Sequence, residues 1–240
     1  MPIRIRQLIR ELSISLLKNL LLSLFFPQRR VDYLRTLLEG IDKDAAMHPV
    51  LKSALDPLAE QVTPLTVEEA QIPPMPGQGR WCAQQILEHL ILTYRLTSES
   101  VSRQLKSGRV PRNRRNLLEF LLRVQTIGLG YMPNGVPAIH AFRPGEFTPE
   151  DGPAIAARFL ETAEEMDQLL VAARRKFGIQ ACGEHPFFGV MRVDEWRRYH
   201  AVHAAHHVDQ LRHAIRYAKG PKAVPEAAPS SMRTAVRAGD

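Results

Sequence analysis

Apolar side chains recur at spacings of three and four along three long segments of this chain, and this pattern constrains its fold most. A helix turns by about 100° per residue, so such spacing gathers apolar side chains into one stripe. The pattern predicts long helices over residues 80–106, 150–176 and 194–219, and a shorter helix over 31–42. The sequence shows no convincing period-two alternation of the kind expected in half-buried strands. We therefore predict an all-α protein folded as a four-helix bundle.

The stretches between these segments are rich in proline or basic residues. Residues 43–79 hold six prolines and predict a loop with one or two helical turns. Residues 117–131 are apolar and predict a further helix, whereas residues 132–150 hold four prolines and predict an extended loop. Residues 221–240 are rich in Ala, Pro and Ser, which predicts a disordered tail.

Residues 1–27 form a separate, leucine-rich segment ahead of the bundle domain, which is expected to span 28–220. Charged residues such as Arg10 and Lys18 interrupt its apolar run over 3–26. A membrane span needs about 20 apolar residues with few charges, so this run is a poor span. It predicts an extra N-terminal helix that docks on the bundle or makes a peripheral contact with a membrane surface. No small-residue cleavage pattern follows it, which disfavours a signal peptide.

The composition bears on partners and compartment. The formal charge of +7 would suit an anionic partner, but the arginines are scattered along the chain. No aromatic residues interleave with the cluster at 109–115 as a stacking platform requires, so we do not expect nucleic-acid binding. Two cysteines are too few for a disulfide scaffold, and the simple interpretation is a reduced, cytoplasmic setting.

Five of the nine histidines fall within residues 200–213. His203 and His207 are four apart, so their side chains project from one face of the predicted helix, at the border of its apolar stripe. Two imidazoles one turn apart are well placed to chelate one metal ion. His206 and His213 fall on the opposite side, which carries charged residues and is expected to be solvated.

A metal held by this pair needs a further ligand from another element. His89 is the best candidate, because it lies at the edge of the apolar stripe in the 80–106 helix. Both features also have a structural interpretation, since pairs with this spacing occur on ordinary solvated helices and a lone histidine is often a satisfied boundary residue. If the metal site exists, the three imidazole nitrogens should lie about 3–4 Å apart.

Four stretches of the chain resemble motifs of the DinB-like superfamily, also called the YfiT-like metal-dependent hydrolases. The closest likeness is to a branch of unknown function with the signature HPFFG, then EEW, then HxxHH. These motifs correspond to His185–Gly189, Asp194–Trp196 and His203–His207, and a tryptophan followed by a histidine eight residues later stands at Trp81–His89. The likeness spans about residues 30–218. Members often carry Thr–Pro before the acidic pair, where this chain has Arg192–Val193, so we expect Asp194 to cap the last helix.

The resemblance implies a four-helix bundle with one divalent metal ion, such as Zn, Ni or Fe, held by His89, His203 and His207. It implies a metal-dependent enzyme, either a hydrolase or a transferase of a small thiol. The alternative is a non-catalytic metal-binding or stress-related bundle protein. The expected partners are a small-molecule substrate, with a low-molecular-weight thiol among the candidates, and a second copy of the chain in a homodimer.

Other residues near these motifs have simpler structural interpretations. We expect His200 to pack at the core boundary and His185 to stabilise a turn before the last helix. Three aromatic residues, Phe187, Phe188 and Trp196, are expected in the core. Three acidic residues, Glu88, Glu195 and Asp209, are expected to be surface charges rather than acid–base groups.

Overall fold

The computed structural model describes residues 47–75, 79–111, 117–134, 138 and 140–220. The predicted helix over 31–42, the N-terminal helix within 1–27 and the tail over 221–240 therefore lie outside the described residues. Within the described ranges, no helix is long and apolar enough to cross a membrane.

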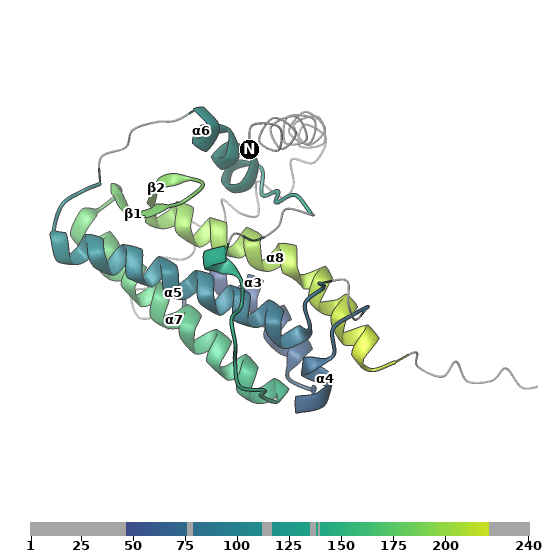
Figure 1. Ribbon diagram of the computed structural model, residues 1–240. Coiled ribbons are helices and arrows are strands. Elements are labelled where there is room, and N and C mark those ends of the chain that lie inside the picture. Colours follow the sequence, from purple (N-terminus) through teal and green to yellow (C-terminus); the bar gives the residue numbers. More distant parts are fainter. Residues whose placement is uncertain (1–46, 76–78, 112–116, 135–137, 139, 221–240) are drawn as a thin grey trace, which may run out of the picture.

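The four longest described helices pack side by side as a bundle (Figure 1). They are α3 (Pro49–Val62), α5 (Ala83–Ser107), α7 (Gly152–Phe177) and α8 (Val193–Ala218). The all-α prediction is confirmed, and three of the predicted helices begin and end within three residues of the observed ones. Their apolar stripes supply the core, which includes fully buried Tyr94 of α5 and Trp196 of α8.

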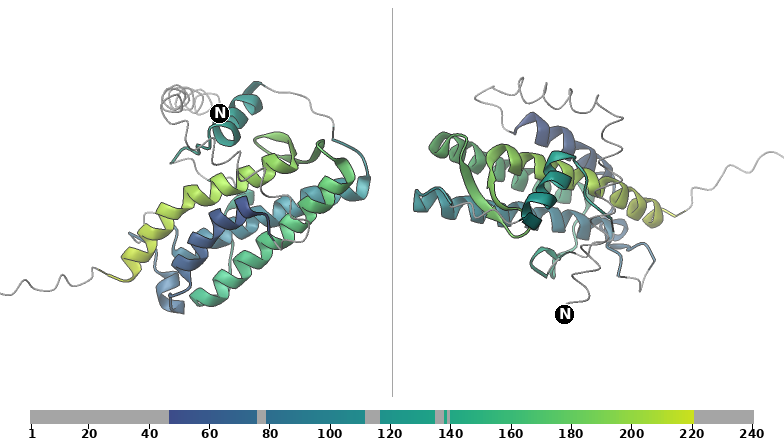
Figure 2. Two further views of the ribbon diagram at one scale, coloured as in Figure 1. Left: turned by 180° about the vertical axis from the view of Figure 1, so that it is seen from behind. Right: turned by 90° about the horizontal axis from the view of Figure 1, so that it is seen from above.

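Helices α3 and α8 run in one direction, and α5 and α7 run in the other (Figure 2). The backbone N–H of His48, just before α3, donates to Asp167 in the middle of α7 at 2.8 Å. At the other end of this pair, Gly152 at the start of α7 lies against the end of α3. A Cβ at Gly152 would come within 2.0 Å of the Val62 carbonyl oxygen, so only glycine allows this approach.

Because α5 and α7 run in the same direction, the chain must return along the bundle between them. The described residues of this crossover include helix α6 (Leu117–Arg123), a π-helical turn η1 (Val124–Gly128) and a 3-10 turn η2 (His140–Phe142). The prediction of a helix over 117–131 is therefore confirmed for most of its length. The crossover also passes beside α5, which places η2 next to one of the histidines described below.

Helix α3 corrects the prediction of a loop over 43–79. Proline in the first turn of a helix sacrifices no intrahelical hydrogen bond, so Pro49 starts α3 rather than ending it. Pro57 lies inside the helix, where Leu51, Leu55 and Leu58 are fully buried and hold it in place. Helix α4 (Val67–Gln71) is short enough to match the one or two helical turns that we predicted here.

A short hairpin joins α7 to α8 and was not predicted. Strands β1 (Ala181–His185) and β2 (Gly189–Arg192) pair antiparallel. Strands of four and five residues are too short for a clear alternation in the sequence. His185 is the last residue of β1, and its Nδ1 accepts the backbone N–H of Phe187 in the turn at 3.1 Å, so its predicted role in stabilising this turn is confirmed. Phe188 is buried as predicted, but Phe187 at the hairpin tip is 42% exposed, so its predicted place in the core is wrong.

Candidate metal centre

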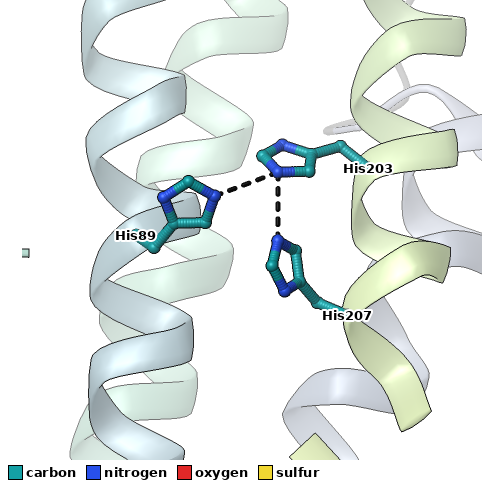
Figure 3. Close-up of side chains that lie close together, drawn as sticks. All are labelled: His89, His203 and His207. Carbon is teal, nitrogen blue, oxygen red and sulfur yellow. Dashed lines mark hydrogen bonds between the residues drawn. The ribbon is translucent and has the colours of Figure 1, made fainter. Parts of the chain in front are cut away.

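Helices α5 and α8 bring three histidines together between them (Figure 3). The Nε2 atom of His203 lies 3.0 Å from Nε2 of His89 and 3.1 Å from Nε2 of His207. All three ligand atoms lie within 4.8 Å of one another. Among the described residues, this is the group of histidine, cysteine and carboxylate side chains that can hold a metal ion.

The antiparallel pairing of the two helices explains this convergence. Thr97, two turns after His89 on α5, meets His200, which lies about one turn before His203 on α8. His203 and His207 then project from one face of α8 towards α5, as their spacing predicts. All three histidines are buried, with exposed fractions of 5% for His89, 5% for His203 and 4% for His207.

Hydrogen bonds on the far side of two rings determine which nitrogen is free to bind. His89 Nδ1–H donates to the carbonyl oxygen of Phe142 in η2, with 2.5 Å between the heavy atoms. His207 Nδ1–H donates to Oε1 of Gln210 at 2.9 Å. An oxygen acceptor requires the proton on Nδ1, so the lone pair of each ring lies on Nε2 and faces His203. His203 differs, because its Nδ1 is buried without a partner among the described residues.

Burial keeps these imidazoles neutral. It lowers the pKa of His89, and it lowers that of His207 to about 3. The pKa of His203 lies well below the ordinary value, first because the ring is buried and then because of its two histidine neighbours. Neutral imidazole is the form that binds metal ions, so no proton has to leave these rings at pH 7.

The Nε2 lone pairs of His89 and His207 both face His203, and one of them lacks a hydrogen-bond donor that a cation could replace. A single proton on His203 Nε2 can satisfy only one of the two Nε2 lone pairs that face it. Metal–nitrogen bonds of 2.0–2.1 Å at angles of about 90–109° need nitrogen atoms about 2.8–3.4 Å apart. The two distances at His203, 3.0 and 3.1 Å, already fall within that range.

The other clustered histidines lie outside this group. His206 is half-buried, and its Nε2 lies 3.3 Å from the Gln210 side-chain nitrogen, so this side of α8 is only partly solvated at this residue. His213 is exposed, as predicted. His200 is fully buried and its Nε2 lies 3.1 Å from the Thr97 hydroxyl, which fits a packing role. Burial lowers its pKa to about 3.

The nearby carboxylates are tied to arginines. Glu88 pairs with Arg158 and Glu195 pairs with Arg123, and the two carboxylate side chains are only 13% and 12% exposed, so neither is the surface charge that we predicted. Their arginine partners lie about 70 residues away along the chain, which no local pattern reveals. Asp209 is exposed, as predicted.

The start of α8 corrects a further prediction. The carboxylate of Glu195 accepts the backbone N–H of Arg192 at 2.8 Å and so takes the capping role that we expected of Asp194. Asp194 instead forms an exposed ion pair with Arg174.

Two groups that orient the histidines were not identified from the sequence. The Phe142 carbonyl is a backbone group in an irregular crossover, and no sequence signal marks it. Gln210 follows His207 by three residues on the same helix, and that spacing could have indicated the contact. Trp81 packs against His89, with ring centroids 5.0 Å apart, and belongs to the tryptophan–histidine motif noted in the sequence.

Comparison with known proteins gives one partial match. Residues 132–214 match the model of a family described as a protein of unknown function, DUF1569. The match covers about a third of the chain and includes His203, His207 and Gln210, but it begins well after His89. No curated protein matches the chain. No solved structure matches it either.

Proposed function

We propose that this protein binds one divalent metal ion through the Nε2 atoms of His89, His203 and His207. The observation that carries the proposal is the convergence of three buried, neutral imidazoles whose Nε2 atoms face one another while two of the Nδ1 atoms are engaged elsewhere. The resemblance to the DinB-like superfamily supports the same ligand set. The family matched over 132–214 belongs to that group of metal-binding folds.

We further propose that the bound ion serves a hydrolase or a transferase of a small thiol. A divalent cation lowers the pKa of a coordinated water or thiol and so supplies a nucleophile near neutral pH. Three histidine ligands leave coordination positions open for such a molecule and for a small-molecule substrate. The chain's own contribution is orientation: the Phe142 carbonyl and Gln210 hold two rings so that their Nε2 lone pairs meet.

A non-catalytic metal-binding bundle is the second candidate. The observation that favours it is the burial of all three histidines to 5% exposure or less, which limits access to the centre. The paired state of Glu88 and Glu195 points the same way, because neither carboxylate is free to act as an acid or base. In this version the ion stabilises the contact between α5 and α8.

Metal analysis of the purified protein tests the binding step. We expect about one equivalent of zinc, nickel, copper or iron per chain, because imidazole suits all of these ions. His203→Ala and His207→Ala should remove the metal, whereas His206→Ala, a matched change on the same helix, should retain it. Failure of the wild-type protein to bind any of these ions after reconstitution would overturn the proposal.

Activity assays on the metal-loaded protein separate the two candidates. The assays should offer activated esters and amides for hydrolysis, and low-molecular-weight thiols with electrophiles for transfer. Turnover that requires the metal and is lost in His203→Ala supports the enzyme. One bound metal with a raised melting temperature and no turnover on either substrate class supports the non-catalytic bundle.

A further inference from the structure

A patch of large apolar side chains lies exposed on α6, away from the three histidines. Helix α6 has no buried residue. We call this surface the α6 patch, and its members with their exposed fractions are Leu117 (73%), Phe120 (55%) and Leu121 (38%), which share one face of the helix because they are three and four residues apart. Single exposed apolar residues are ordinary, but a contiguous group marks a surface that another element covers.

Polar contacts hold α6 beside the hairpin. Arg123 at the end of α6 donates to the carbonyl oxygens of Phe188 at 3.3 Å and Val190 at 2.7 Å. Glu119 lies so close to the hairpin that a Cβ at Gly189 would meet its carboxylate. Figure 1 shows α6 next to the two strands. Because Glu119 and Arg123 are on the face of the helix that meets the hairpin, Leu117, Phe120 and Leu121 lie on the other face and stay exposed.

The chain carries an apolar segment of its own that needs such a surface. Of the 24 residues from 3 to 26, 14 are Leu, Ile or Phe. The described chain begins at Met47, which packs against the core. The backbone N–H of the next residue, His48, donates to Asp167, and Asp167 forms an ion pair with Arg197 on α8. Arg197 lies two residues from Glu195, which pairs with the last residue of α6. The chain therefore enters the bundle at the end that carries the patch.

The remaining connection is long enough to reach the patch. Residues 27–46 can span up to about 60–70 Å when extended. A tether of this kind keeps the segment at about millimolar effective concentration near the patch, which favours it over a partner from solution.

We propose that residues 3–26 of the same chain dock on the α6 patch through their leucines. The contact buries apolar side chains on both partners, which is the dominant favourable term in such an association. The proposal concerns a surface remote from the histidines and does not depend on metal binding.

Hydrogen–deuterium exchange on the full-length protein tests this docking. We expect amides within 3–26 to be protected, and the double variant Leu117→Ser with Phe120→Ser should raise their exchange by at least about tenfold, because each buried Leu or Phe contributes more than that factor. Ile179→Ser is the matched control, since Ile179 is 72% exposed and lies outside the patch. It should leave the protection of 3–26 unchanged.

Three outcomes would overturn the docking. The first is the absence of protection in 3–26 in the wild-type protein. The second is protection that appears only when vesicles containing anionic lipid are added, which would assign the segment to a membrane. The third is protection that depends on protein concentration, which would assign the patch to a second copy of the chain.

Discussion

Replacing Gln210 by leucine tests how the site is oriented. Gln210 accepts the Nδ1–H of His207 at 2.9 Å, and leucine keeps the side-chain volume while removing this acceptor. Loss of such an outer contact typically weakens metal binding by about 10–100-fold. Gln210 is exposed, so water can replace part of the lost bond, and we expect about a tenfold loss, or about 1.4 kcal/mol. The free energy of unfolding of the metal-free protein should change by no more than about 0.5 kcal/mol, as is usual at exposed positions.

Competition with a chromophoric chelator measures this affinity directly on zinc-loaded protein. Two variants serve as controls: Gln210→Glu retains an acceptor and should bind at least as tightly as wild type, and Asp209→Asn changes a neighbouring exposed side chain and should have no effect. Binding of Gln210→Leu with unchanged affinity, in a protein that loses its metal on His207→Ala, would refute the idea that this contact orients the ligand.

Two further predictions concern stability. Gly152→Ala should lower the free energy of unfolding by about 2 kcal/mol or more, because its Cβ would collide with the Val62 carbonyl oxygen, whereas Gly145→Ala meets no atom within 4 Å and should be close to neutral in urea titrations. Burial lowers the pKa of His185 to about 3, so the folded protein keeps this ring neutral while the unfolded chain takes up a proton below about pH 6.5. Stability from this residue is therefore complete above pH 6.5 and falls by about 1.4 kcal/mol per pH unit below it. In the metal-free protein, His185→Phe should reduce the loss of unfolding free energy between pH 7 and pH 5 by about 2 kcal/mol, and an unchanged loss would contradict a neutral buried imidazole.

The sequence was most informative where one helical stripe decides the structure. The long helices were predictable because each has a continuous apolar face, and the shared face of His203 and His207 follows from the same periodicity. Helix α3 was missed because prolines were counted as breakers, although Pro49 lies where a helix tolerates proline and the leucines beside Pro57 supply burial.

The parts of the site that depend on distant contacts were harder to predict. The place of His89 opposite His203 depends on the direction of α5 relative to α8, and the resemblance to a known superfamily, rather than the spacing, implied it. The Phe142 carbonyl belongs to the crossover, whose path follows from the parallel arrangement of α5 and α7. Such contacts are set by tertiary packing, and a local pattern carries no information about them.

X-ray absorption spectroscopy of the zinc-loaded protein tests the central claim most directly. The account predicts about three imidazole nitrogens at 2.0–2.1 Å from one zinc ion per chain, with the remaining coordination filled by oxygen or nitrogen atoms that do not belong to histidine. The same spectrum from His89→Ala should show fewer imidazole ligands or no bound zinc, because His89 is the ligand supplied by the second helix. In protein prepared without added thiol, a zinc ion coordinated by sulfur would contradict the three-histidine site, as would an imidazole count that stays at three in His89→Ala.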